Sequence, residues 1–193
     1  FALGGKDYIV TPLKNGAVKV IQRNGKDRLS LSNKIPANNN QVFLKVGNDL
    51  SKTYLIAVDT IGNISKLFMN DKKELMASEK RLNNLQFNFF DFNNNNSKDH
   101  IFSHDNLVRV YDADKKLILE KEVPTNITYV PQLFKLNSGN RIGLVTESEI
   151  YLINANGEIE DGFPLAGSTP FSVADINNDN TTSNNDDHTM IIL

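Results

Sequence analysis

The stretch Ile21-Gln22-Arg23-Asn24-Gly25-Lys26 decides the fold, because the chain repeats it three more times. The counterparts are Phe68-Met-Asn-Asp71-Lys72-Lys73, Tyr111-Asp-Ala-Asp114-Lys115-Lys116 and Ile153-Asn-Ala-Asn156-Gly157-Glu158. The steps between the Asx residues, from Asn24 to Asn156, are about 47, 43 and 42 residues. A constant period in the forties is typical of a repeat architecture, in which each unit buries its apolar face against its neighbours.

A second landmark keeps the same phase along the chain. It is a short apolar run that ends in a turn. It occurs as Phe43-Leu-Lys-Val46-Gly-Asn48, Phe89-Phe-Asp-Phe92-Asn-Asn94, Leu133-Phe-Lys-Leu136-Asn-Ser138 and Val173-Ala-Asp-Ile176-Asn-Asn178. Its steps are about 46, 44 and 40 residues, so two independent signals indicate one repeat.

Each repeat contains four short runs rich in Val, Ile, Leu, Phe and Tyr, bounded by turn residues. The clearest repeat has these runs at 87–92, 100–103, 107–111 and 117–123, and the next repeat at 132–136, 141–146, 150–154 and 159–165. The preceding repeat has them at 42–46, 54–58, 64–68 and 74–77. Only 75–84 is a weak helix candidate. Four antiparallel strands per repeat predict an all-β fold, a β-propeller of four-stranded blades.

The other all-β folds fit less well. A parallel β-helix has much shorter coils, and a β-sandwich does not need turns at a fixed period.

The chain is expected to form one propeller of about four blades plus a partial one. The approximate blades are 1–35, 41–78, 85–124, 129–167 and an incomplete 169–193. Because both ends fall inside blades, we expect this segment to belong to a larger propeller. The alternative is a closed ring of four blades, in which the strand at 171–175 completes the N-terminal blade.

Composition excludes several classes of function. The net charge is −2 with no basic stripe, so nucleic acid is not an expected partner. No apolar run approaches the length of a membrane-spanning helix, so no transmembrane segment is expected. The chain has no cysteine, which excludes disulfides, thiolate nucleophiles and thiolate zinc sites.

One loop has the spacing of a cation site. Side-chain oxygens stand at its positions 1, 3, 5 and 9 (Asp91, Asn93, Asn95 and Asp99), and the backbone carbonyl of Ser97 stands at position 7. Alternate residues of a tight loop converge, and Ca²⁺ takes six to eight oxygen ligands. The loop is therefore a candidate calcium site, although Asx-rich loops also form Asx turns without any metal.

The last repeat carries a looser version of this loop. It has Asp175, Asn177 and Asp179 at the corresponding positions. The equivalent loops of two other repeats begin with Lys45 and Lys135, which would repel a cation.

The chain resembles the FG-GAP or VCBS-type propeller repeats of integrin α-subunits and secreted bacterial proteins. Those repeats carry an Asp-x-Asp/Asn-x-Asp-Gly-x-x-Asp calcium loop between the first two strands of a blade. The resemblance implies calcium ligands at both loops, with Asn96 and Asn180 in place of the family's glycine. It also implies a periplasmic, cell-surface or secreted bacterial protein.

Two stretches, 108–119 and 150–159, are similar to PQQ-type propeller repeats, which also build a scaffold lipoprotein of outer-membrane assembly. The typical Trp of those repeats is missing, since the chain contains no Trp. Quinone binding is therefore not expected, and a scaffold role stays open.

No residue pattern indicates catalysis. His100 and His104 stand four apart in an expected strand, about 13 Å along one face, too far to share a metal. Glu147 and Glu149 are interpreted as solvated turn residues, and the Phe87–Phe92 aromatics as core. We expect a non-enzymatic scaffold that binds a protein, or alternatively a glycan. The competing interpretation is the propeller domain of a hydrolase, lyase or quinone-type dehydrogenase whose active site lies outside this segment.

Overall fold

Strands of β-branched and aromatic residues, joined by Asn, Asp and Gly turns, build the whole described chain. The computed structural model describes residues 1–3, 5–37, 39–59, 63–76, 85–136, 138–175 and 188–192. Over these residues the secondary structure is all β, as predicted, and every strand pair is antiparallel. The chain divides into two compact units, Phe1–Asn84 and Leu85–Leu193.

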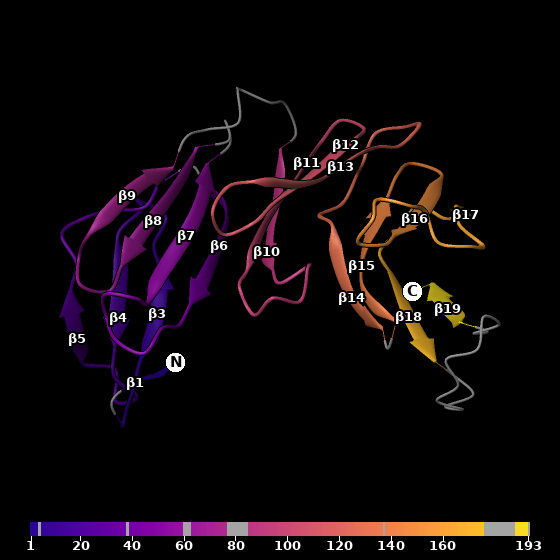
Figure 1. Ribbon diagram of the computed structural model, residues 1–193. Coiled ribbons are helices and arrows are strands. Elements are labelled where there is room, and N and C mark those ends of the chain that lie inside the picture. The colour runs from indigo at the N-terminus through magenta and orange to yellow at the C-terminus, as the bar shows by residue number, and fades with distance from the viewer. Residues whose placement is uncertain are drawn as a thin grey trace. The chain divides into compact units, whose positions relative to one another are not determined.

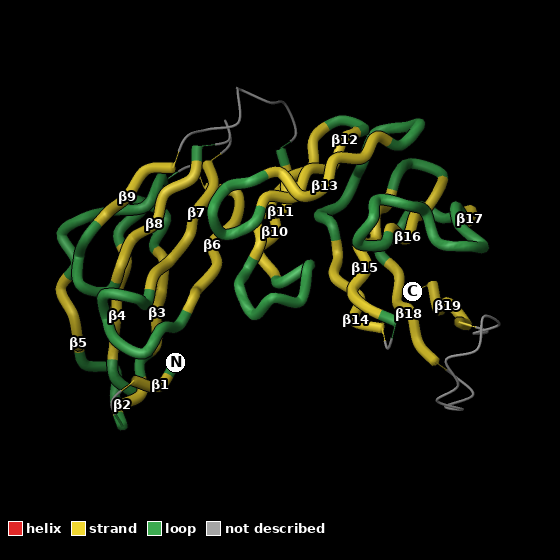
Figure 2. The backbone as a smooth tube through the Cα atoms, in the orientation of Figure 1, coloured by secondary structure: helices red, strands yellow, loops and turns green. Residues whose placement is uncertain are grey.

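The described part of the first unit forms a small hairpin and two larger sheets (Figures 1 and 2). The hairpin pairs β1 (Ala2–Leu3) with β2 (Lys6–Asp7), and the three-stranded sheet consists of β3 (Ile9–Pro12), β4 (Val18–Ile21) and β5 (Asp27–Ser30). The four-stranded sheet consists of β6 (Asn39–Lys45), β7 (Tyr54–Asp59), β8 (Ile64–Phe68) and β9 (Lys73–Met76). Val18 and Val20 of β4 pack with Leu55, Ala57 and Leu67, so the two larger sheets share one core.

The described residues of the second unit form three sheets (Figure 1). They consist of β10 (Gln86–Phe90), β11 (Asp99–His104), β12 (Leu107–Tyr111) and β13 (Leu117–Glu122), then β14 (Gln132–Leu136), β15 (Gly139–Val145), β16 (Glu149–Ile153) and β17 (Leu165–Ala166), and lastly β18 (Phe171–Asp175) and β19 (His188–Ile192). Within each sheet the strands follow one another in sequence order.

The middle sheet of the second unit is buried on both faces. On one face, Ile142 and Ile153 are paired across β15 and β16 and pack against Ile101, Val110 and other side chains of the β10–β13 sheet. On the other face, a second core joins Val145, Ile150 and Leu152 to Phe171 of β18. Alternate residues of one strand thus serve two interfaces, which is how stacked blades pack.

The predicted strands agree with the structure except at the outer edge of the β14–β17 sheet. A strand over 159–165 was predicted, but Ile159 forms only an isolated bridge to Ile153, and β17 is two residues long. The chain turns at Gly162, whose φ is +85°, and Pro164 has no N–H to donate to a ladder. These two residues shorten the edge strand.

A turn forms at each of the four predicted places, but one of the four alignments is wrong by one residue. In each turn the N–H at position 4 donates to the carbonyl at position 1; the donors are Gly25, Asp71, Lys115 and Gly157. All four donors have positive φ. Asn70, whose side chain accepts from the Lys72 N–H at 3.2 Å, is therefore the counterpart of Asn24, which accepts from the Lys26 N–H at 3.1 Å.

The closure of the blades into a ring stays a prediction. The strand at 171–175, which would complete the N-terminal blade in a closed ring of four, is β18, and it pairs with β19. The predicted weak helix at 75–84 is wrong in its first two residues, because Leu75 and Met76 belong to strand β9. The rest of it, residues 77–84, lies outside the described residues. In the part of the chain that the structure covers, no helix has the length and apolarity to cross a membrane.

Candidate functional site

The candidate calcium loop lies between β10 and β11 and is ordered by hydrogen bonds to its own side chains. The Asp91 carboxylate accepts the N–H of Asn95 at 3.0 Å through Oδ1 and that of Asn96 at 2.8 Å through Oδ2. Asn93 Oδ1 also accepts the Asn95 N–H, and Asn95 Oδ1 accepts the Ser97 N–H at 2.8 Å. The loop therefore curls around the Asp91 carboxylate.

Two asparagines of this loop adopt the left-handed backbone conformation. Asn96, at the position where the FG-GAP-type loops that this loop resembles have glycine, has a φ of +66°, and Asn94 has a φ of +59°. Asparagine tolerates this left-handed region better than other side-chain-bearing residues do. Asn96 thus takes the positive-φ conformation that a glycine at this position would readily adopt.

Asp99 closes the loop from the first residue of β11. Its side chain is buried, and its Oδ2 accepts the N–H groups of Phe92 at 2.8 Å and Asn93 at 3.2 Å. Its Oδ1 is buried without a hydrogen-bond partner among the described residues. Burial raises the pKa of Asp99 above its ordinary value of 3.8, and the nearby carboxylates of Asp91 and Asp112 act in the same direction.

Neighbouring segments hold the loop in place. Phe92 is buried in the core between the first two sheets of this unit, and Asn140 at the start of β15 donates its side-chain N–H to the Asp91 carbonyl at 2.9 Å. The loop is thus fixed to the next sheet and not only to its own strands.

The loop brings four of the predicted ligands into one hydrogen-bonded turn: Asp91, Asn93, Asn95 and Asp99. A carboxylate oxygen that accepts one N–H keeps a second lone pair for a cation. The Ser97 N–H donates to Asn95 Oδ1. Among the described contacts of this loop, none involves the Ser97 carbonyl, which was the predicted backbone ligand. Within the described residues, no three His, Cys, Asp or Glu side chains gather closely enough to hold a metal by themselves, so any cation here depends on amide and carbonyl oxygens.

The second predicted loop lies mostly outside the described residues. Asp175 ends β18, paired with His188, and Asn177 and Asp179 lie outside the described residues.

The loop after β6 is a structural turn. Asp49 Oδ1 accepts the N–H groups of Ser51 and Lys52 at 2.8 and 3.0 Å, and its Oδ2 lies 4.0 Å from Lys52 Nζ. The Ser51 hydroxyl, followed by these backbone bonds, lowers the pKa of Asp49.

The groups rejected as catalytic hold structural positions. His100 and His104 both lie on β11, and the His100 ring lies 5.1 Å from the ring of Phe89. The Tyr151 hydroxyl donates to Glu149 at 2.5 Å, and burial together with this carboxylate raises the pKa of Tyr151 to about 12. Phe87, Phe89 and Phe92 are buried, as predicted.

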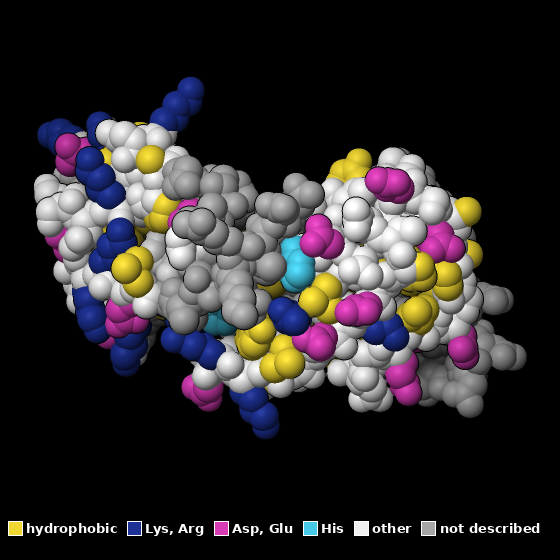
Figure 3. Space-filling model, turned by 90° about the horizontal axis from the view of Figure 1, so that it is seen from above, with side chains coloured by type: hydrophobic (Ala, Val, Ile, Leu, Met, Phe, Trp, Pro, Cys, Tyr) yellow, Lys and Arg dark blue, Asp and Glu magenta, His cyan; other side chains and the backbone are white. Residues whose placement is uncertain are grey.

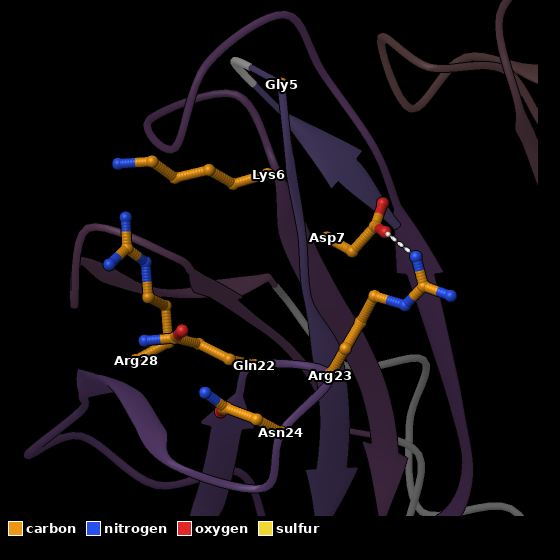
Figure 4. Close-up of a pocket in the computed structure, with 7 residues that line it drawn as sticks. All are labelled: Gly5, Lys6, Asp7, Gln22, Arg23, Asn24 and Arg28. Atoms are coloured by element: carbon orange, nitrogen blue, oxygen red, sulfur yellow. Dashed lines mark hydrogen bonds and ion pairs between the residues drawn. The ribbon is translucent and has the colours of Figure 1, made fainter.

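A polar hollow in the first unit was missed by sequence reasoning (Figure 4). It measures about 390 Å³ and lies between the β1–β2 hairpin and the β4–β5 turn. The residues around it are Gly5, Lys6, Asp7, Gln22, Arg23, Asn24 and Arg28. The available signal was local charge, because residues 1–35 contain seven Lys or Arg and only two Asp.

Comparison with known proteins adds no family. A scan against protein-family models gives no match to this chain, and a search of curated proteins finds no match.

Proposed function

We propose that this chain is a non-enzymatic propeller scaffold of a bacterial cell-envelope or secreted protein, which binds a partner protein through the loops at one end of its blades. The observation that carries the proposal is the stack in the second unit, where the β14–β17 sheet buries both faces against its neighbours. Such stacks present their loops in a row on a rigid support. A glycan is the alternative partner.

The proposal includes calcium at the 91–99 loop. Support comes from the turn around Asp91 and from the buried Asp99, which has one oxygen without a hydrogen-bond partner among the described residues. A cation would satisfy that oxygen and offset the repulsion between the two carboxylates. With only two carboxylates, the affinity is expected to be that of extracellular modules, with a Kd of about 0.1–1 mM.

Calorimetric titration and thermal melting of the metal-stripped protein test the calcium site. At 10 mM, Ca²⁺ should stabilise the wild type by about 1–3 kcal/mol through mass action. Asp91→Asn and Asp99→Asn should abolish the calcium-dependent part of this gain. Glu122→Gln, which removes an exposed carboxylate from β13, should retain it. If the wild type gives neither binding heat nor a rise in Tm, the calcium site is refuted.

Site-specific photo-crosslinking tests the scaffold role. Ala113 and Thr125 are both exposed, and they lie at opposite ends of the β10–β13 sheet. A photo-reactive residue at position 113, at the same end as the 91–99 loop, should crosslink one envelope protein, and purified wild-type chain should compete. The same residue at position 125 should not. Equal labelling from both positions, or none from either, contradicts the proposal.

A further inference from the structure

The polar hollow of the first unit is lined by cationic and amide side chains that approach it from two segments. Lys6 comes from β2, Arg28 from β5, and Gln22 and Asn24 from the turn between β4 and β5. In Figure 4, Lys6 and Arg28 extend to the same side, whereas Arg23 turns toward Asp7. Each of these four side chains lines the hollow and carries hydrogen-bond donors.

The hollow has an excess of positive charge. Asp7 is its only carboxylate among the described lining residues, and it contacts Arg23 at 3.2 Å. No carboxylate lies within ion-pair distance of Lys6 or Arg28 in the described part of the chain. The Arg23 and Asp7 side chains are 81% and 49% exposed, so their pair is weak and leaves Arg23 free to turn to a stronger anion.

The wall of the hollow formed by the β4–β5 turn and Arg28 is ordered by contacts within the chain. The Arg28 guanidinium stacks over the ring of Tyr8, with 5.8 Å from Cζ to the ring centroid, and Tyr8 is buried. The turn is closed by the Gln22 N–H donating to the Lys26 carbonyl at 2.9 Å. Asn24 Oδ1 accepts the Lys26 N–H, so the amide N–H₂ of Asn24 remains available as a donor. The donors on this wall therefore lose less conformational entropy on binding than unsupported side chains would.

The surrounding charge acts in the same direction. Seven of the chain's 21 Lys and Arg residues, but only two of its 23 Asp and Glu residues, lie in residues 1–35. Lys and Arg side chains are numerous over the first unit in the space-filling view (Figure 3). Their combined potential raises the local concentration of anions although the whole chain has a net charge of −2.

We infer that this hollow binds a phosphate or sulfate group. A tetrahedral oxyanion offers acceptors in several directions, which suits an ammonium, a guanidinium and two amides that approach from two segments. A planar carboxylate would engage fewer of these donors and should bind more weakly. This site is independent of the calcium loop and of the scaffold role.

Titration of the isotope-labelled protein by NMR tests the inference, with inorganic phosphate, inorganic sulfate and acetate at constant ionic strength. Phosphate and sulfate should shift the amide signals of residues 5–7 and 22–28 in a saturable manner, and acetate should bind more weakly. Lys6→Gln and Arg28→Gln should each weaken phosphate binding about three- to fivefold, because the groups are partly exposed. The double variant should lose about tenfold or more. Lys14→Gln, the same change at an exposed lysine outside the hollow, should have little effect.

Asp7→Asn should change phosphate affinity in the opposite direction to the other variants. It removes the one carboxylate among the described lining residues and frees Arg23, so phosphate affinity should rise. This gain cannot arise from unfolding, and melting curves of all variants identify any that fail to fold. Phosphate shifts that never saturate, that spread equally over the other lysines, or that are insensitive to Lys6, Asp7 and Arg28 overturn the inference. A sulfated or phosphorylated oligosaccharide that binds more tightly than the free ions would identify the group as part of a larger ligand.

Discussion

The residue at the fourth position of each repeated turn determines how much backbone strain the turn carries. The fourth residue of every turn has positive φ, and two of the four turns place glycine there, at Gly25 and Gly157. The other two place Asp71 at +70° and Lys115 at +68°. A residue with a Cβ is disfavoured in this region by about 1–2 kcal/mol, so the second and third turns carry a local cost.

Lys115→Gly should therefore stabilise the protein. The Lys115 side chain is exposed, and its role in the turn is through the backbone N–H, which glycine keeps. The expected gain in the free energy of unfolding is about 0.5–1 kcal/mol, measured by urea denaturation. Ala113→Gly, in the same turn but without positive φ, should instead destabilise by a similar amount. A loss of stability in Lys115→Gly would contradict this account of the turn.

Asp71 offsets its own strain through contacts to the end of the neighbouring sheet. Its Oδ2 accepts the Ser32 N–H at 3.0 Å and the Ser32 hydroxyl, and its Oδ1 accepts the Asn33 N–H at 2.9 Å. The Ser32 hydroxyl, followed by these backbone bonds, lowers the pKa of Asp71 below its ordinary value of 3.8. The carboxylate thus joins two sheets of the first unit.

This lowered pKa predicts an acid-sensitive contribution to stability. A carboxyl whose pKa is lower in the folded state stabilises the fold above pH 3.8, and the stabilisation is lost as the pH falls through the folded pKa. Asp71→Asn should be less stable than the wild type at pH 7, because an N–H₂ group would face the N–H donors of Ser32 and Asn33. The difference in urea midpoint should shrink as the pH falls below 3.8. Ser32→Ala should weaken this pH dependence, and a constant difference at every pH would refute the mechanism.

At the scale of elements, β15 and β16 join two cores. Ile142 and Ile153 face the β10–β13 sheet, while Ile150 faces the β18–β19 side, and all three are fully buried. The register places Ile142 opposite Ile153, and Ile150 opposite Val145. The β14–β17 sheet therefore contributes side chains to a separate core on each of its two faces.

Isoleucine-to-alanine substitutions measure whether these interfaces are independent. Each of Ile142→Ala, Ile150→Ala and Ile153→Ala should cost about 2–5 kcal/mol in the free energy of unfolding. The double variant at Ile142 and Ile150, on opposite faces, should be additive within about 0.5 kcal/mol. The double variant at Ile142 and Ile153, which are cross-strand neighbours in one core, should be non-additive. Equal coupling in both pairs would mean that the two cores are not separate.

Elements were the part of the fold that sequence reasoning could predict. The runs at 107–111 and 132–136 match β12 and β14, because apolar residues between Asx and Gly turns leave few alternatives. The strand at 159–165 failed because Gly162 and Pro164 outweigh the apolar character of the run. The one-residue error at Asp71 arose because hydrogen bonding, and not residue type, defines position 4 of the turn.

Of the two candidate sites, one could be predicted from the sequence and the other could not. The loop around Asp91 could be predicted because its residues are contiguous and their spacing is fixed by the chain. The hollow could not, because Lys6 and Arg28 are 22 positions apart and meet only through the pairing of β3, β4 and β5. Residues 1–35 show their charge in the sequence, but its convergence depends on tertiary structure.

At the scale of the molecule, charge is unevenly distributed. The isoelectric point is about 5.9, yet the first 35 residues are strongly basic. Patches of one sign act over about 20–30 Å at low ionic strength. A surface of opposite charge can therefore bind this region of an overall acidic protein.

Ion-exchange chromatography tests this asymmetry. At pH 7 and low salt, a cation exchanger should retain the chain despite its net charge of −2, and about 0.2 M salt should release it. The triple variant Lys6→Gln, Arg23→Gln, Arg28→Gln should pass through unretained. A matched triple variant in the second unit, Lys115→Gln, Lys116→Gln, Lys121→Gln, should still be retained. Identical elution of the two variants would show that the basic region is not the cause.

The sequence-ordered connectivity of the sheets has a consequence for how the protein is made. Every strand in a sheet pairs with the strand that precedes or follows it in the chain, so each sheet is encoded by one contiguous segment. A ribosome supplies such a segment in a few seconds at about 5–20 residues per second, whereas a β-hairpin forms in about 1–10 μs. Each sheet can therefore form its ladders from strands that have already been translated, without waiting for a strand from a later part of the chain.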